Sequence, residues 1–286
     1  MKLSDIPVRV LGPGSQPADE DGQTLSYMSM PSDMQKFVRP EVPEPDDVRD
    51  LVAARDAMRW LTDALADRGE QPRLANLAAL DDESRALVNQ ILGEGEVSVT
   101  RTGPVPSKTQ ESVLAGVWRT LYQDQAGAIV ADLLEVAAVP HVVVQPEPQA
   151  RPVDTSADGV PEGINNALPI LVELQAQLDE YRASGRPHVI NLTLLPLSEE
   201  EVAFVDDRLG RGAVDVLSRA YGKCQVSSTL TPNVWWVRYY NSMGTLILNT
   251  LEVVEVPQVV LAAPEDIADS AARLADIIAP YWPELA

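Results

Sequence analysis

Apolar residues recur at helical spacing in two well-separated stretches of the chain. Within each stretch they lie three or four positions apart, so that they share one face of a helix. They are Leu51, Ala54, Met58, Leu61 and Leu65 in the first stretch, and Leu171, Leu174, Leu178 and Tyr181 in the second. The pattern predicts one amphipathic helix in each stretch, packed by its apolar face on a core.

A second helix is expected after each amphipathic helix, separated from it by a short β-prone segment. The later of these helices has clear ends, because Ser198 and Glu201 form a capping box and Gly210 occupies the position of a C-cap glycine. Its counterpart extends from Asp81 to Gly93. The β-prone segments lie near 74–80 and at 188–195.

The C-terminal part of the chain continues with a run of β-prone segments and one more helix. These segments are 213–219, 223–230, 233–240, 244–249 and 251–256. The last helix begins after Pro264, with Glu265 and Asp266 in its first turn, where the helix dipole favours negative charge. Consecutive strands beside helices predict an α+β fold with a mainly antiparallel sheet.

The chain matches itself at a constant offset of 117 positions, without a gap between Leu92 and Val143. The aligned pairs include residue types that chance does not easily place together. They are Trp118 with Trp235, Tyr122 with Tyr239, Gly127 with Gly244, and Pro140 with Pro257. We interpret the match as an internal duplication, which predicts two similar tandem units, each with helices packed on a sheet.

Two segments interrupt the periodic pattern. Residues 1–47 are rich in Gly, Pro and acidic residues, and predict an extended or disordered tail. Residues 146–164 have the same character and predict a linker. The two α+β units then comprise residues 48–145 and 165–286.

The charge of the chain argues against some classes of binding partner. The formal net charge is -21, with 22 Lys and Arg against 43 Asp and Glu. Nucleic acids and anionic membrane surfaces bind through cationic side chains, so the composition argues against both. No apolar run has the length of a signal peptide or of a membrane span, which predicts a cytoplasmic protein without stable membrane insertion. An acidic surface suits a basic partner, although it also keeps a protein soluble.

Cys224 is the single cysteine, which excludes an intrachain disulfide and a cysteine-rich metal site within one chain. Its thiol is either a redox or metal-touching group, activated by Lys223, or a small half-buried residue at the start of a strand. His141 and His188 each follow a proline, and either one paired with Cys224 would give a nucleophile and a base. Their spacing matches no catalytic signature, which favours ordinary strand-edge histidines. We expect no cofactor.

The most unusual segment is NVWWVRYYNSM, residues 233–243. In a strand, Trp236, Arg238 and Tyr240 share one face, whereas Trp235 and Tyr239 share the other. The duplicate keeps the second set but not the first. Because Trp, Tyr and Arg are enriched at interface hot spots, Trp236, Arg238 and Tyr240, with the adjoining Asn241, are candidate partner-binding residues. The alternative is that a helix or the tail covers this face.

Several segments of the chain resemble the HupH/HyaF hydrogenase-expression family. The C-terminal ones are INLTLLPL at 190–197, LGRGAV at 209–214, SRAYGKC at 218–224 and the tryptophan-rich segment at 233–243. The N-terminal ones are GPGSQP at 12–17 and MPSDM at 30–34. The resemblance extends over nearly the whole chain.

This resemblance implies an accessory protein for membrane-bound uptake nickel–iron hydrogenases, and not an enzyme. Members of the family are thought to assist the iron–sulfur small subunit before its twin-arginine export, often beside a thioredoxin-like accessory protein. The expected partners are therefore the small-subunit precursor and that thioredoxin-like protein. Two alternatives remain: a redox or metal-handling maturation factor that uses Cys224, and a scaffold for other maturation proteins.

Overall fold

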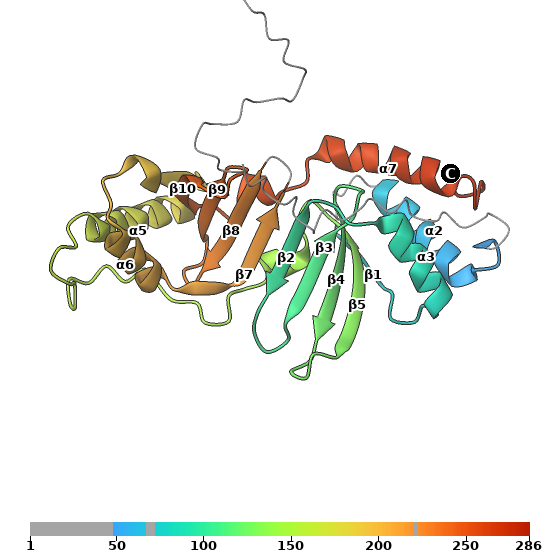
Figure 1. The fold of residues 1–286 in the computed structure, drawn as a ribbon, viewed down its shortest axis with the longest axis horizontal. Helices are drawn as coiled ribbons and strands as arrows, with labels where there is room; N and C mark the ends of the chain where they lie inside the picture. Colours follow the sequence, from blue (N-terminus) through green and yellow to red (C-terminus); the bar gives the residue numbers. More distant parts are fainter. Residues whose placement is uncertain (1–47, 67–71, 220–221) are drawn as a thin grey trace, which may run out of the picture. The chain divides into compact units, whose positions relative to one another are not determined.

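Ten strands form one antiparallel sheet in the computed structural model, which describes residues 48–66, 72–219 and 222–286 (Figure 1). From edge to edge their order is β1-β5-β4-β3-β2-β7-β8-β9-β10-β6. The strands are β1 Arg73–Asn76, β2 Val97–Arg101, β3 Ser107–Glu111, β4 Val117–Gln123, β5 Ile129–Val136, β6 His188–Asn191, β7 Arg211–Ser218, β8 Lys223–Thr229, β9 Val234–Tyr240 and β10 Leu246–Val253. The tail expected over residues 1–47 lies outside the described residues.

The strand order is the same when it is followed inward from either edge. Each edge strand pairs with the fifth strand of its half, and the remaining strands follow in reverse order to the centre. There β2 and β7 pair antiparallel, with Val99 opposite Val216. These two residues are 117 positions apart in the chain, which is the offset of the self-match.

The helices begin and end close to the predicted positions. Their bounds are α2 Val52–Ala66, α3 Asp82–Leu92, α4 His141–Val144, α5 Ala167–Ser184, α6 Glu199–Leu209 and α7 Pro264–Ile278, with 3₁₀ turns η1 Leu192–Leu194 and η2 Gln258–Val260. The Ser198–Glu201 capping box is formed, and Gly210 is the C-cap of α6. Three expectations are wrong. Segments 244–249 and 251–256 belong to a single strand, β10, because Thr250 stays in register with Val237 of β9. The strand expected at 188–195 ends at Asn191, where η1 follows, and His141 begins α4 instead of lying at the edge of a strand.

Two helical layers cover the two ends of the sheet on one face. Directly opposed residues of neighbouring strands share a face of the sheet. Successive opposed pairs lead across the sheet from Leu121 to Trp236, so these two residues lie on the same face. The residues between them are Lys108, Thr100, Asp215 and Ser227. Val117, on the face of Leu121, packs in one core with α2 and α3, whereas Trp236 packs in another with α5 and α6. We call this side of the sheet the helix face.

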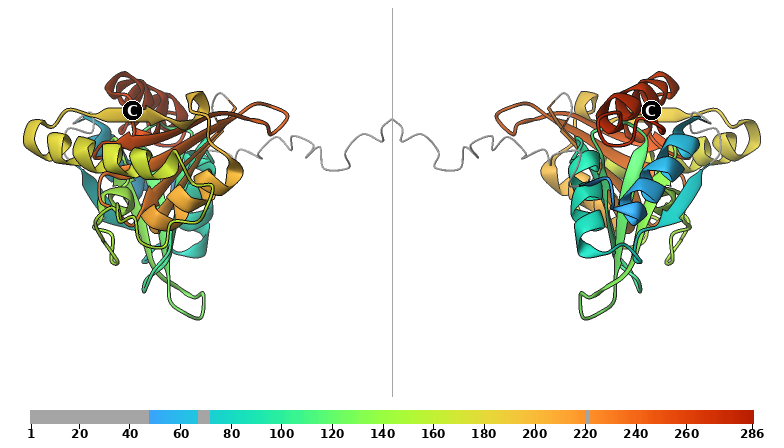
Figure 2. Two further views of the ribbon diagram at one scale, coloured as in Figure 1. Left: turned by 90° about the vertical axis from the view of Figure 1, so that its left-hand side faces the viewer. Right: turned by 90° about the vertical axis from the view of Figure 1, so that its right-hand side faces the viewer.

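The last helix crosses from the second half of the chain to the first. α7 lies beside α2, as both views show (Figures 1 and 2). Its buried residues Ile267, Leu274 and Ile278 belong to the core of α2 and α3. In the other direction, Val153 of the connecting segment belongs to the core of α5 and α6. The core of each half is thus completed by a segment that follows the other half in sequence.

The opposite face of the sheet is covered at its centre. Val142 and Val143 of α4 pack there with Val260 of η2 and with the central pair Val99 and Val216. Side chains of β8 and β9, including Cys224, Trp235 and Val237, complete this core. The centre is therefore buried on one face and open on the helix face, where a functional surface can form.

Candidate functional site

The helix face of the sheet is open over its middle strands, between the two helical layers. A cavity of about 460 Å³ lies beside the end of α3, and a second of about 230 Å³ adjoins it over β7 and β8, because Ser98 and Thr100 line both. We call this surface the central trough. Its floor comprises Ser98, Thr100, Lys108, Gln110, Arg119, Leu121, Asp215, Leu217, Lys223 and Gln225.

The four predicted contact residues have different positions. Trp236 is 2% exposed and lies in the core beneath α5 and α6. Arg238 crosses above it, with its guanidinium carbon 4.4 Å from the ring centroid, and remains 24% exposed. Tyr240 is half-buried, and the Lys223 ammonium lies 5.3 Å from its ring centroid. The side-chain oxygen of Asn241 accepts hydrogen bonds from Met243 N and Thr245 N, so Asn241 shapes the β9–β10 turn.

The burial of Trp236 does not fit the expectation that its side chain forms a contact surface. The face is covered by helices of the same half, which was the stated alternative for this residue. Arg238 and Tyr240 lie farther along the strand, opposite Gln225 and Lys223 at the margin of the central trough, and Arg238 lies 3.9 Å from Asp206 of α6. The strand alternation was correctly predicted, but how far the helices extend over it was not contained in the pattern.

Arg119 occupies the position in the first half that Trp236 occupies in the second. The Trp236 indole donates a hydrogen bond to Asn249, and Arg119 donates to Asp132, which stands 117 positions before Asn249. The same pair of places thus holds an aromatic–amide contact in one half and an ion pair in the other. In the second half the Trp236 indole fills the space beneath the helices, whereas in the first half the larger cavity lies beside Arg119.

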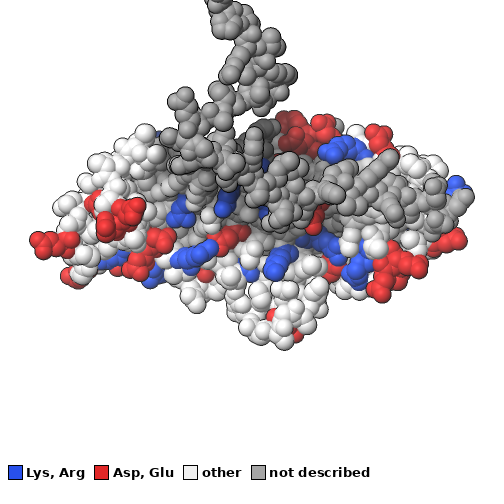
Figure 3. Space-filling view, viewed as in Figure 1, with Lys and Arg blue, Asp and Glu red and all other residues white. Residues whose placement is uncertain are grey.

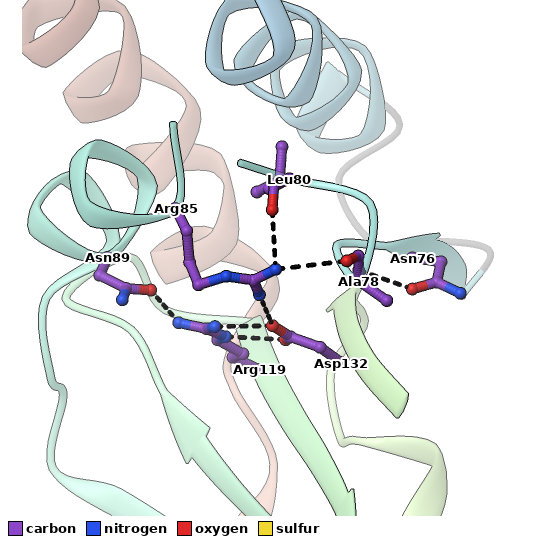
Figure 4. Close-up of polar contacts among 7 residues, drawn as sticks. All are labelled: Asn76, Ala78, Leu80, Arg85, Asn89, Arg119 and Asp132. Atoms are coloured by element: carbon purple, nitrogen blue, oxygen red, sulfur yellow. Dashed lines mark hydrogen bonds and ion pairs between the residues drawn. The ribbon is translucent and has the colours of Figure 1, made fainter. Parts of the chain in front are cut away.

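Asp132 binds two guanidinium groups at once (Figure 4). Arg119 donates to it in a bidentate manner, with Nε and Nη2 at 2.9 and 2.7 Å, and Arg85 of α3 donates from Nη1 at 2.7 Å. Arg119 also contacts the side chain of Asn89, and Arg85 donates to the carbonyl of Leu80. Because one buried carboxylate faces two cations, the cluster keeps an excess positive charge beside the cavity.

The candidate thiol is buried on the opposite face. Cys224 is 5% exposed, and burial raises its pKa to about 11, although a hydrogen bond with Tyr239 partly opposes that shift. A thiol with this pKa is almost fully protonated at neutral pH, so it is a poor nucleophile and metal ligand. His141 instead contacts Glu135 and Tyr122, and His188 contacts Glu173.

His141 has partners that its sequence neighbourhood did not reveal. Its Nδ1 lies 2.7 Å from the buried Glu135 carboxylate and its Nε2 lies 2.6 Å from the Tyr122 hydroxyl. The backbone N of His141 also donates to Glu135, so this carboxylate holds the first residue of α4. The arrangement attaches α4 to the sheet. Among the residues that the structure describes, no group of three or more His, Cys, Asp or Glu is arranged to hold a metal ion.

Lys108, Arg85 and Asp132 are not among the residues predicted from the sequence. A signal for part of this cluster was present: at the 117-residue offset, Arg119 and Asp132 replace Trp236 and Asn249 together. Such a paired change indicates contact. The contribution of Arg85 and Lys108 depends on strand register and on the placement of α3.

In the described part of the chain, no helix is both long and apolar enough to cross a membrane.

Comparisons with known proteins indicate one family. Residues 52–157 and 164–281 each match the family described as HupH hydrogenase expression protein, C-terminal conserved region. The chain is 42% identical over 283 residues to the hydrogenase expression/formation protein HoxQ of Cupriavidus necator, covering 97% of this chain and 98% of that one. It is 40% identical to HupH of Rhodobacter capsulatus, with 96% of both chains covered.

Two further similarities extend this comparison. The hydrogenase-1 operon protein HyaF of Escherichia coli is 31% identical, with 96% of both chains covered. A solved structure of the hydrogenase expression protein HupH from Thiobacillus denitrificans is 32% identical and covers 40% of this chain and 95% of its own, with a TM-score of 0.39.

Proposed function

Because the chain belongs to the family of HupH hydrogenase expression proteins, we propose that it is an accessory protein of hydrogenase formation. The observation that carries this proposal is similarity over nearly the full length of several relatives with that role in their names. Hydrogenase maturation is thus its proposed process. The protein acts by binding, in the cytoplasm, rather than by catalysis.

The proposed client is the precursor of the iron–sulfur small subunit, before its export. A binding role needs an open surface with fixed polar groups, and the central trough has these features. Arg238 and Tyr240 lie at its margin, where the buried Trp236 supports the Arg238 guanidinium from below. A thioredoxin-like accessory protein is the proposed second partner.

A redox or metal-handling role for Cys224 has less support. The thiol is buried, and its raised pKa keeps it protonated near neutral pH. Ser107 stands 117 positions earlier and also is buried, so the matched place tolerates a hydroxyl in the same framework. Binding therefore remains the better-supported function.

We also propose that the two halves descend from one duplicated unit. Three observations support this: the gapless 117-residue match, the strand order that is the same from either edge, and the two separate stretches that match one family. The turns agree as well, because Asp124 caps the β4–β5 turn as Asn241 caps the β9–β10 turn. Gly127 and Gly244 in these turns both have positive φ, at 84° and 78°.

The proposed function is tested by capture of the precursor. Tagged wild-type protein, Arg238→Ala and Tyr240→Ala would be purified from cells that express the hydrogenase operon, and the bound small-subunit precursor would be quantified. We expect both variants to unfold at the wild-type temperature and to retain less precursor. Arg182→Ala on α5, an exposed cation outside the trough, should bind as wild type.

Two results would contradict parts of this proposal separately. If the wild-type protein captures no precursor, the assignment of the client is wrong. If Arg238→Ala and Tyr240→Ala capture as much as wild type, the client binds elsewhere on the protein. Bound metal in the purified wild-type protein would favour the alternative maturation factor.

A further inference from the structure

The trough is positively charged in a strongly acidic chain. The cations that line it are Lys108, Arg119 and Lys223, and the carboxylates that line it are Glu94 and Asp215. Beside them, Arg85 and Arg238 contact Asp132 and Asp206. Asp215 is already paired with Arg211 at its rim. In Figure 3, blue side chains lie in the middle of the view, where Figure 1 shows β2, β3, β7 and β8, and red side chains lie toward both ends.

The cations on the first half are fixed in different ways. Arg119 is held by Asp132 and Asn89, which leaves part of its guanidinium free to donate toward the cavity. Lys108 is exposed and lines the same cavity, and it forms no ion pair with the residues that the structure describes. Ser98 and Thr100 supply hydroxyls between these cations and the second cavity. A ligand here would meet one rigid and one adaptable positive group.

We propose that the central trough binds an acidic segment of a partner polypeptide, with a carboxylate seated between Arg119 and Lys108. The charge of the trough indicates an anionic ligand, because its cations outnumber the carboxylates that can neutralise them. A nucleic acid is disfavoured, since the net charge of -21 repels a long polyanion. Leu92, Leu121 and Leu217 line the same cavities and can contact the aliphatic parts of a peptide.

The dimensions of the trough fit an extended peptide. From β4 to β8 the floor crosses four strand spacings, roughly 19 Å, which accommodates about six extended residues. The second half does not offer an equal site, because the Trp236 indole occupies the position of Arg119. The inference goes beyond the proposed function, since it concerns the chemistry of the bound segment whichever hydrogenase component carries it.

The test measures fluorescence anisotropy of a short labelled peptide in which glutamate alternates with alanine. A matched peptide with glutamine in place of glutamate is the ligand control. We expect the full-length protein to bind the glutamate peptide, more weakly as salt rises, and to ignore the glutamine peptide. Lys108→Gln should weaken binding by about threefold to fivefold, as expected for one exposed ion pair.

A second variant blocks the cavity with the residue of the other half. Arg119→Trp should abolish most of the binding, by about tenfold or more, because it removes a cation and fills the space. Arg182→Gln removes an exposed cation outside the trough and should leave the affinity unchanged. If Arg119→Trp lowers the unfolding temperature strongly, the affinity of Lys108→Gln for the glutamate peptide alone tests the proposed site.

Three outcomes for the two peptides and for Lys108→Gln would each overturn the proposal. They are equal binding of the two peptides, absence of binding to the glutamate peptide, and wild-type affinity of Lys108→Gln. An equal loss of affinity in Arg182→Gln would also overturn it, since attraction would then be general to the surface. Precursor capture is measured separately, so a failure of the proposed client and a failure of this site are distinguishable.

Discussion

At the scale of single residues, the places that match across the two halves reveal which side chains are interchangeable. Ser107 matches Cys224, and both are buried. Arg119 matches Trp236, and there the chemistry differs, with an ion pair to Asp132 on one side and an indole hydrogen bond on the other. Where the matched residues differ in chemistry, as Arg119 and Trp236 do, the difference indicates a role other than maintaining the framework that both halves share.

For Cys224, we expect Cys224→Ser to fold and to cost about 1 kcal/mol, because a buried hydroxyl replaces a thiol at a place where the other half holds serine. The native wild-type thiol should react slowly with a thiol reagent at neutral pH and quickly after unfolding. Urea unfolding and labelling rates measure both effects. Fast labelling of the folded protein would contradict the burial of this residue and revive the redox alternative.

For Trp236, we expect Trp236→Ala to lower the free energy of unfolding by about 3–5 kcal/mol, because it empties a large volume beneath α5 and α6. Trp236→Phe should cost less, since it retains most of the apolar contact. Urea unfolding measures both. A stable Trp236→Ala protein that loses only precursor binding would show that this side chain is part of the contact surface.

Glu111 predicts a pH dependence of stability. Burial, aided by the charges of Glu96 and Asp266, raises its pKa from 4.5 to about 7. The folded protein therefore holds a proton that the unfolded chain releases, and this stabilisation is present below pH 4.5 and lost as the pH rises through 7. We expect a loss of about 1–2 kcal/mol after allowance for solvent screening.

The control for this effect is Glu111→Gln, which keeps the shape of the side chain and removes the titration. Thermal unfolding between pH 5 and 8 should show a smaller decrease of the unfolding temperature in the variant than in the wild type. An equal decrease in both proteins would assign the effect to other groups.

Glu201 has the reverse sign: its pKa is lowered to about 2 by N–H donors of Asn166, Ser198 and Asn165, so its contribution to stability is lost only in acid.

At the scale of elements, the exchange of terminal segments makes each half depend on the other. The apolar face of α7 is predictable from Ile267, Leu274 and Ile278, and the structure places it on α2 rather than on α5 and α6. The segment that follows α4 makes the reciprocal crossing, with Val153 in the other core and Arg151 bonded to the carbonyls of α6. Contacts of this kind join the segment that follows each half in sequence to elements of the other half.

We expect Leu274→Ala on α7 to destabilise the first half of the sheet selectively. The substitution removes a fully buried side chain from the core of α2 and α3, at a cost of about 2–5 kcal/mol. Hydrogen exchange should accelerate in α2 and α3 more than in α5 and α6. Leu178→Ala on α5 is the matched control and should give the opposite distribution. Acceleration confined to α5 and α6 in Leu274→Ala would contradict the crossing.

At the scale of the whole molecule, the β2–β7 pairing joins two halves into one sheet with a shared core on the opposite face. Val99 and Val216 face each other there, under Val142 and Val143 of α4. Together with the two crossing segments, this interface holds the two halves of the sheet against each other. Its stability should not depend on the covalent connection between the halves.

We therefore expect the chain to remain assembled after cleavage in the exposed connection. A protease site inserted between Pro148 and Gln149, both exposed, would separate the halves covalently. The two fragments should elute together in size-exclusion chromatography, because the β2–β7 pairing and α7 still hold them. Val216→Asp, which buries a charge in the shared core, should make the cleaved fragments separate. Separation of the cleaved wild-type fragments would show that the connection itself maintains the assembly.

The sequence alone determined the features that depend on neighbouring positions. Helical spacing located α2, α5 and α7, the capping box defined the start of α6, and alternation assigned Trp235 and Trp236 to opposite faces. Local spacing is enough for these, because it sets which side of an element is apolar. The family also followed from the sequence, since its characteristic segments are contiguous.

Only the tertiary structure decided which elements meet. Trp236 is covered because α5 and α6 pack over β9, and the Arg85–Asp132 ion pair joins residues that strand register and the placement of α3 bring together. Likewise, α7 packs on the first half, although its apolar face alone does not specify which core it joins. Partners distant along the chain are selected by the packing of complete elements, and local periodicity carries no information about that choice.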